Sequence, residues 1–119
     1  MNKGIFFGML FHARDYIHLA HLDITGPGSY ATHKALNEFY AELIEITDEL
    51  IEATQGDEGI IQITIPVTTL SESALDFLLV FKEYINKQRI LFKENWQQSL
   101  LDDIQQLISK TIYKLKYLK

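Results

Sequence analysis

The chain has 119 residues, of which 47% are hydrophobic, and its formal net charge is −5. These values are typical of one folded domain over residues 1–119 and exclude a disordered chain. An acidic balance argues against binding to nucleic acid, and no stretch approaches the roughly 20 apolar residues of a membrane span. The lack of cysteine excludes disulfide bonds, thiolate metal ligands and cysteine catalysis.

The first predicted element is a helix over residues 3–24. Its apolar residues recur three and four positions apart, which is the spacing of one buried helix face. A Gly-Pro turn at residues 25–29 then reverses the chain, and Thr25 or Ser29 is expected to be the N-cap of the next helix. The apolar positions are Ile5, Met9, Leu10, Ala13, Ile17, Ala20 and Ile24.

A longer helix is predicted over residues 29–55, ending at Gly56, because glycine commonly follows a helix C-terminus. This helix carries two polar pairs with a spacing of four residues, and residues four apart lie on one helix face. Each pair therefore has the geometry of a metal-ligand pair. The turn before the helix should also bring His21 back beside its first pair. The pairs are His33 with Asn37 and Asp48 with Glu52.

The two pairs face the same way but lie at different heights on the helix. Asn37 and Asp48 are about 16 Å apart along the axis, and eleven steps of about 100° return to within about 20° of the start. One ion therefore cannot contact both pairs in one molecule. An antiparallel second copy, related by a two-fold axis, would set His33 against the partner's acidic pair and create two equal sites. The alternative is a solvated helix face without metal.

The segment after the second helix is predicted to be extended. In IIQITIPVTT, isoleucines alternate with Gln62 and Thr64 like a strand, but Pro66 limits it to a sheet edge or a strap. Fourteen extended residues span at most about 48 Å, and a helix of about 27 residues is about 40 Å long. The connection is thus long enough to cross a whole helical bundle. A β-hairpin arm or a strap exchanged between two copies is the alternative.

The last part of the chain is predicted to form two more helices. Residues 69–72 fit a capping box for the third helix, and Asn95 with a glutamine three residues later indicates the start of the fourth. No glycine or proline marks the boundary between them. The expected fold class is therefore all-α, a four-helix bundle with a long extended crossover between the second and third helices.

The stretch from His21 to Glu52 resembles the Dps-like mini-ferritins, especially small Dps-related proteins of tailed phages. The ferroxidase motif of that family is His, twelve residues on His, four on Asp, eleven on Asp and four on Glu. This chain has His21, His33, Asn37, Asp48 and Glu52 at those positions. The resemblance implies a ferritin-like bundle in the cytoplasm, or the host cytoplasm for a phage protein. It also implies a dimer through the second helix, assembled further into a dodecamer, with iron or another divalent metal between subunits.

Two departures from the family motif bear on activity. Asn37 replaces an aspartate, which removes one negative charge and a bridging ligand, and Leu22 stands where the family has tryptophan. Two functions therefore remain open. One is a mini-ferritin that oxidises and sequesters ferrous iron, with a ferroxidase activity weakened by Asn37. The other is a catalytically inactive ferritin-like scaffold or interaction protein, phage-encoded. Neither is expected to bind nucleic acid or a membrane.

Overall fold

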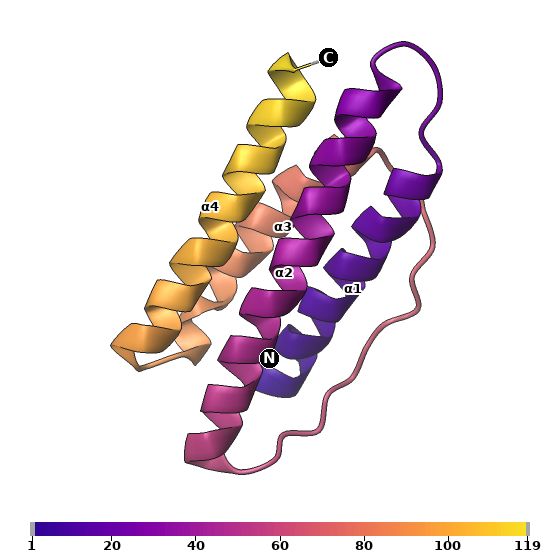
Figure 1. Ribbon diagram of the computed structural model, residues 1–119. Coiled ribbons are helices and arrows are strands. Elements are labelled where there is room, and N and C mark those ends of the chain that lie inside the picture. Colours follow the sequence, from indigo (N-terminus) through magenta and orange to yellow (C-terminus); the bar gives the residue numbers. More distant parts are fainter. Residues whose placement is uncertain (1, 119) are drawn as a thin grey trace.

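The computed structural model describes residues 2–118 as four α-helices and a long extended connection. Figure 1 shows α1 and α4 running in one direction and α2 and α3 in the other. The 30 residues of α2 give a length of about 45 Å, close to the 47 Å long axis of the molecule. The all-α, four-helix prediction is confirmed. The helices are α1 (Lys3–Leu22), α2 (Ser29–Glu58), α3 (Ala74–Gln88) and α4 (Asn95–Tyr117), with a short 3-10 helix η1 (Arg89–Leu91) after α3.

All four helices contribute to one apolar core. The main packed pairs are α1 with α2, α2 with α4 and α3 with α4, and a smaller contact between α1 and α3 closes the ring. Phe92, just before α4, packs edge-on against Phe6 of α1 with ring centroids 5.2 Å apart. Burial of such rings is a large part of the force that drives folding. Fully buried residues include Phe6, Phe7, Phe39, Leu43, Leu78, Ile85 and Ile104.

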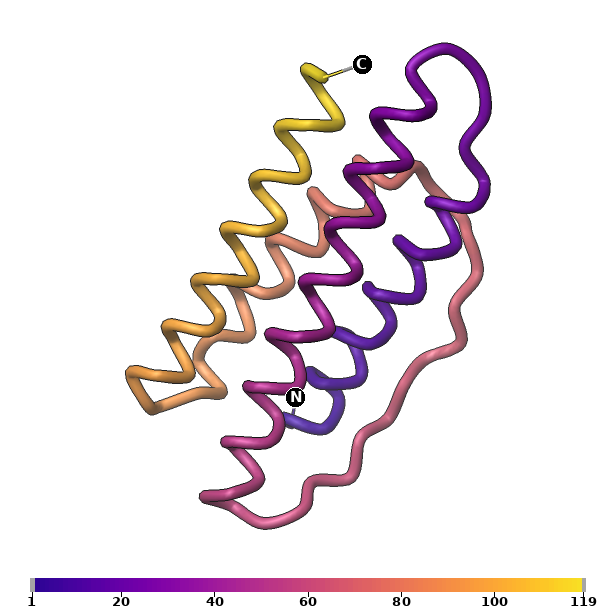
Figure 2. The backbone as a smooth tube through the Cα atoms, viewed as in Figure 1, coloured from indigo at the N-terminus to yellow at the C-terminus, as the bar shows by residue number. Residues whose placement is uncertain are grey.

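Residues 59–73 form the crossover strap, which leaves the end of α2 and reaches the start of α3 at the opposite end of the bundle. Figure 2 shows this segment running alongside α1. Two glycines of α1 permit the close approach, because a Cβ at Gly4 would lie 2.1 Å from the Gln62 carbonyl oxygen. At Gly8 it would lie 1.6 Å from that of Thr64. The predicted crossover is confirmed, and the β-hairpin alternative is wrong, since residues 2–118 contain no strand.

The end of the crossover strap is held by Tyr16 of α1. Its buried hydroxyl donates to the Glu72 carbonyl at 2.6 Å and accepts from the backbone amides of Ser71 and Glu72 at 3.1 and 2.8 Å. His12 adds a hydrogen bond of 2.8 Å between its Nδ1 and the Thr68 hydroxyl. These contacts place the start of α3 next to α1.

Several predicted helix ends are wrong by one to a few residues. α1 ends at Leu22 because Asp23 leaves the helical conformation. α2 continues through Gly56 and ends before Gly59, whose φ of 88° is the left-handed conformation that favours glycine.

The predicted N-caps are also displaced. Gly28 precedes α2, so neither Thr25 nor Ser29 caps it. Ser73, and not the segment 69–72, caps α3 by accepting from the Asp76 amide. Glu94 caps α4 in a capping box with Gln97, one residue earlier than predicted. The corrections at α3 and α4 follow from local hydrogen bonds, because several neighbouring polar residues could satisfy the same free amides. None of the helices within residues 2–118 is long and apolar enough to cross a membrane.

Candidate metal-binding site

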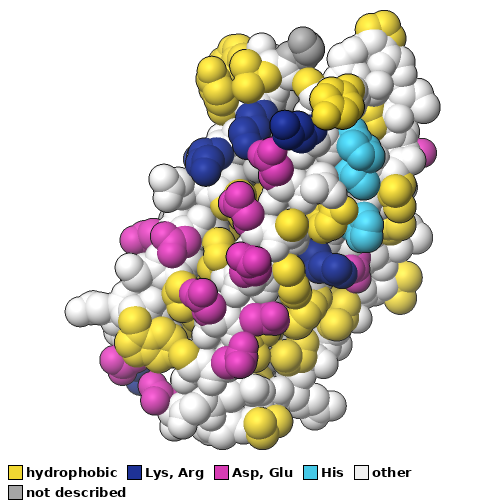
Figure 3. Space-filling model, viewed as in Figure 1, with side chains coloured by type: hydrophobic (Ala, Val, Ile, Leu, Met, Phe, Trp, Pro, Cys, Tyr) yellow, Lys and Arg dark blue, Asp and Glu magenta, His cyan; other side chains and the backbone are white. Residues whose placement is uncertain are grey.

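Two histidines meet where α1 passes into α2. The rings of His21 and His33 stack with centroids 3.7 Å apart and planes inclined by 29°. The reversal between the helices uses Gly26 and Gly28, both with positive φ, a conformation that glycine adopts without strain. His21 is buried, whereas His33 is exposed. Figure 3 shows imidazoles gathered on one face of the molecule beside the start of α2.

The hydrogen bond of His33 determines which ring nitrogen is free. Its Nδ1 lies 3.2 Å from the backbone carbonyl oxygen of His21. A carbonyl can only accept, so Nδ1 carries the proton, and Nε2 of the neutral ring has the lone pair. Histidines that bind metals commonly donate their second ring nitrogen to a carbonyl in this way. His33 is therefore held in the tautomer that can ligate a metal through Nε2.

His21 is also kept in the neutral form. Burial lowers the pKa of His21 below 6.5, and the neighbouring His33 and His18 lower it further. The backbone of His18 raises the pKa and so opposes this shift. Its effect is the smallest of the four, and His21 Nδ1 is buried without a hydrogen bond of normal geometry. Neutral imidazole is the form that ligates metals, so the lowered pKa of His21 favours ligation by this residue at neutral pH.

Tyr40 is a member of this site that the sequence reasoning missed. Its ring stacks on His18 at 4.3 Å and meets His21 edge-on at 5.4 Å. Its hydroxyl donates to Oδ1 of Asn37 at 2.7 Å. Asn37 thus lies next to the imidazoles, but its side-chain oxygen is already engaged. The spacing of three residues from Asn37 to Tyr40 and seven from His33 could have revealed this contact, because such positions share a helix face.

Asp48 and Glu52 lie elsewhere on α2. Both are exposed, and their carboxylates form no ion pair or hydrogen bond with another residue of the described chain. Along the axis, residue 48 is about 22 Å from residue 33, so these carboxylates do not reach the imidazoles of their own chain. Residues 2–118 contain no group of three or more His, Cys, Asp or Glu side chains that could hold a metal. A complete metal site would thus need ligands from another molecule.

The fold and the paired imidazoles define a class: an all-α protein of four packed helices in which a buried histidine of α1 stacks on an exposed histidine of α2, the longest helix. The chain belongs to a family of unknown function, DUF5856, whose model matches residues 21–115. The match includes the imidazoles and the two carboxylates of α2.

The chain is also similar to an uncharacterized 14.6 kDa protein encoded in the mobD–ri intergenic region of Enterobacteria phage T4. The two are 29% identical over 115 residues, which are 95% of this chain and 84% of the phage protein. No solved structure matches the chain.

The predicted kinship with Dps-like mini-ferritins is wrong, because the family that matches is a different one, without an assigned function. The relative is an uncharacterized phage protein, so only the coarser expectation of a relation to phage proteins holds. The misleading signal was a set of polar pairs four residues apart. That spacing is common on long amphipathic helices and carries little information about ancestry.

Proposed function

We propose that this protein binds a divalent transition metal between two copies of itself. His21 and His33 of one copy would supply nitrogen ligands, and Asp48 and Glu52 of the second copy would supply oxygen ligands. The observation that carries the proposal is the His33 tautomer, which the His21 carbonyl fixes with Nε2 free. A mixed nitrogen and carboxylate ligand set suits Zn²⁺ and Fe²⁺. Retention of the ion between the copies, in the cytoplasm, is the function this arrangement supports.

The exposed face of α2 suits an antiparallel second copy. A two-fold axis that sets His33 against the acidic pair would pass near Ala41, which is exposed and small enough for two helices to approach closely. The same pairing would set Lys34 of each copy opposite Glu49 of the other, and both of these residues are exposed. The charges of the two copies would then be complementary along the contact.

Titration calorimetry of metal-free protein with Zn²⁺, and with Fe²⁺ under anaerobic conditions, tests the histidine half of the proposal. We expect His33→Ala to weaken metal binding at least tenfold, because loss of even a residue that orients a metal ligand typically has an effect of about this size. The matched control is His12→Gln, because His12 bonds to Thr68 away from the site, and it should bind as the wild type does. Equal binding by wild type and His33→Ala would overturn the proposal.

A mixing experiment tests whether the ligands come from two copies. Neither His33→Ala nor the double variant Asp48→Asn/Glu52→Gln should bind metal tightly as a homodimer. After the two are unfolded together and refolded, half of the dimers are mixed, and each contains one intact site. About a quarter of the wild-type capacity should therefore return, at wild-type affinity. No recovery, with dimers present by sedimentation, would show that the acidic pair does not act across an interface.

A second candidate is an interaction or assembly protein without catalysis. The observation in its favour is the apolar surface of the crossover strap, where Ile60 is 88% and Val67 91% exposed. Ile65 and Leu70 of the same strap are also exposed, and groups of exposed apolar side chains are typical of contact sites for other proteins. Sedimentation velocity in the presence of EDTA separates the candidates. Association that persists without metal and is lost in Ile60→Ser/Val67→Ser would favour this second function.

A further inference from the structure

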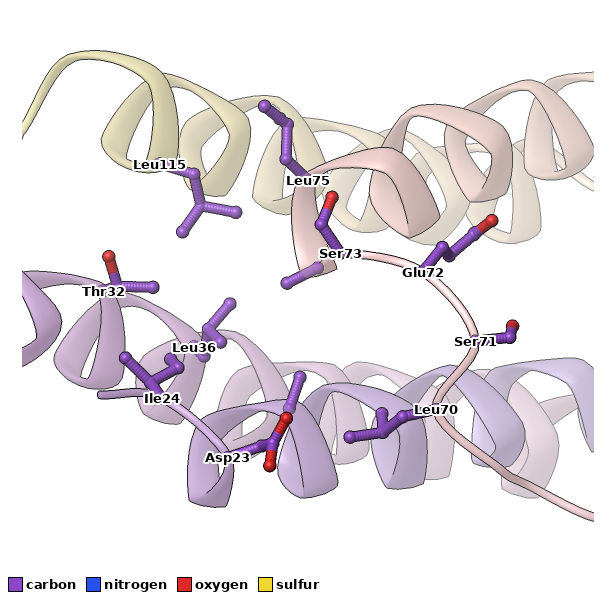
Figure 4. Close-up of a pocket in the computed structure, with 12 residues that line it drawn as sticks. Asp23, Ile24, Thr32, Leu36, Leu70, Ser71, Glu72, Ser73, Leu75 and Leu115 are labelled. Carbon is purple, nitrogen blue, oxygen red and sulfur yellow. The ribbon is translucent and has the colours of Figure 1, made fainter. Parts of the chain in front are cut away.

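A cavity of about 620 Å³ opens at the end of the bundle where α1 passes into α2 and where α3 begins. Its wall combines residues of all four helices with the end of the crossover strap. Figure 4 shows Leu115 of α4 facing Leu36 of α2 across the space, with Leu70 of the strap at one side. The volume lies within the range of about 300–1,000 Å³ that small-molecule sites occupy.

Apolar side chains form about half of the cavity wall, and this apolar part is well supported. Leu36 is fully buried beneath it, and Ile24, Leu75 and Leu115 are partly buried around it. The strap side is held in place by the hydrogen bonds of Tyr16 to Ser71 and Glu72. The apolar part of a ligand would therefore contact a wall that is already formed, and less of the binding free energy would be spent on ordering the protein.

The charge at the rim is negative. Asp23 lies at the lower rim in Figure 4, and its carboxylate has no ion pair or hydrogen bond with another described residue. Glu72 also lines the cavity, although its side chain points away from it (Figure 4), and no lysine, arginine or histidine is among the lining residues. The N-terminus of α3 also lines the cavity, at Ser73 and Ala74. The positive end of its helix dipole is partly compensated by Asp76 in the first turn.

These features together select a ligand with an apolar body and a positive head. We infer that the cavity binds a small amphipathic amine, with its hydrocarbon part among Leu36, Leu70 and Leu115 and its ammonium group at Asp23. An acid with the same hydrocarbon part would place a second negative charge beside Asp23 and should be rejected. None of the proposed metal ligands is among the residues that line the cavity, although Asp23 and Thr32 lie close in sequence to His21 and His33.

The test uses dansylcadaverine, a fluorescent apolar primary amine, as the probe. We expect saturable binding that decylamine displaces, that decan-1-ol displaces less well and that decanoate does not displace. Asp23→Asn should weaken probe binding by about threefold, which is the scale of a solvent-exposed ion pair. Asp57→Asn is the matched control, because Asp57 is an exposed acid at the far end of α2, and it should bind as the wild type does.

A second variant tests the cavity itself. Leu115→Trp adds bulk where the Leu115 side chain faces the space (Figure 4) and should abolish probe binding, provided that its circular dichroism remains that of a folded helical protein. The proposal would be overturned by non-saturable binding, by displacement with decanoate equal to that with decylamine, or by wild-type affinity in Asp23→Asn. A probe affinity that falls as protein concentration rises would assign the cavity to a second copy and would also overturn it.

Discussion

Gly8 of α1 lies directly beneath the backbone of Thr64 in the crossover strap. A methyl group on Gly8 would lie 1.6 Å from the Thr64 carbonyl oxygen, and Gly4, one turn earlier, has the same relationship with Gln62. The strap can therefore follow α1 only because α1 presents two glycines four residues apart on one face. The helix gives up some intrinsic stability at these positions, and the close contact with the strap offsets it.

We predict that Gly8→Ala destabilises the protein by about 1–3 kcal/mol, because the added methyl group forces the strap backbone away from α1. Chemical denaturation followed by circular dichroism measures the change. Gly56→Ala is the matched control, since Gly56 lies inside α2 with nothing near its Cβ position. It should gain roughly 0.5–1 kcal/mol from better helix propensity. Equal effects of the two substitutions would contradict the close contact.

Tyr16→Phe should loosen the end of the crossover strap. The substitution keeps the ring, which stacks on Phe77 at 4.0 Å, but removes the hydroxyl that bonds Ser71 and Glu72. We expect a loss of about 1–2 kcal/mol, because water can reach the freed backbone groups. Hydrogen exchange at these two amides should accelerate. Tyr113→Phe, at a tyrosine that is 55% exposed, should leave both quantities unchanged.

A buried polar pair connects α2 with the start of α4. Gln97, 3% exposed, donates from Nε2 to the hydroxyl of the fully buried Thr54 at 3.0 Å. Thr54→Val leaves that donor without a partner and should cost about 1–3 kcal/mol. In a double-mutant cycle with Gln97→Leu, the two changes should be non-additive by at least about 0.5 kcal/mol. Simple additivity would mean that the pair contributes no coupling.

Stability should depend on pH through His21. Its pKa in the folded protein is lowered from 6.5, chiefly by burial, so the unfolded chain binds a proton first as the pH falls. The stability that neutral His21 contributes is complete above pH 6.5 and is lost as the pH drops towards the folded pKa. His12, with a pKa lowered by burial, acts in the same direction, while Glu38, lowered from 4.5 by Lys114, acts at more acidic pH.

Urea unfolding between pH 5 and 8 measures this dependence, and NMR titration of the imidazoles assigns it. The slope of unfolding free energy against pH should be smaller in His21→Gln than in the wild type. His33→Gln should reduce the slope less than His21→Gln does, because burial, the larger cause of the lowered His21 pKa, remains in that variant. A wild-type profile that stays flat below pH 6.5 would contradict the burial of a neutral His21.

Helical periodicity and chain length were enough to predict much of the architecture. Apolar residues three and four apart are a local signal, so the four α-helices within residues 2–118 could be placed without knowledge of their partners. The crossover could be predicted because the segment after α2 is long enough to span the bundle. The meeting of His21 and His33 followed in the same way from a short Gly-Pro turn. Helix ends were less certain, since Glu94 and Asn95 are both able to cap α4.

Contacts between distant segments could not be read in this way. The spacing of Gly4 and Gly8 does not predict which backbone segment will pack on them. Nor does the sequence around Thr54 predict that its hydrogen-bond partner is Gln97. The cavity beside Asp23 exists only because four helix ends and a strap meet without filling the space between them. Local patterns report the conformation of a segment, whereas packing depends on the shapes of all segments at once. The family was predicted wrongly for a similar reason. The spacing of polar residues on α2 indicates which residues share a helix face, but it does not identify the protein family.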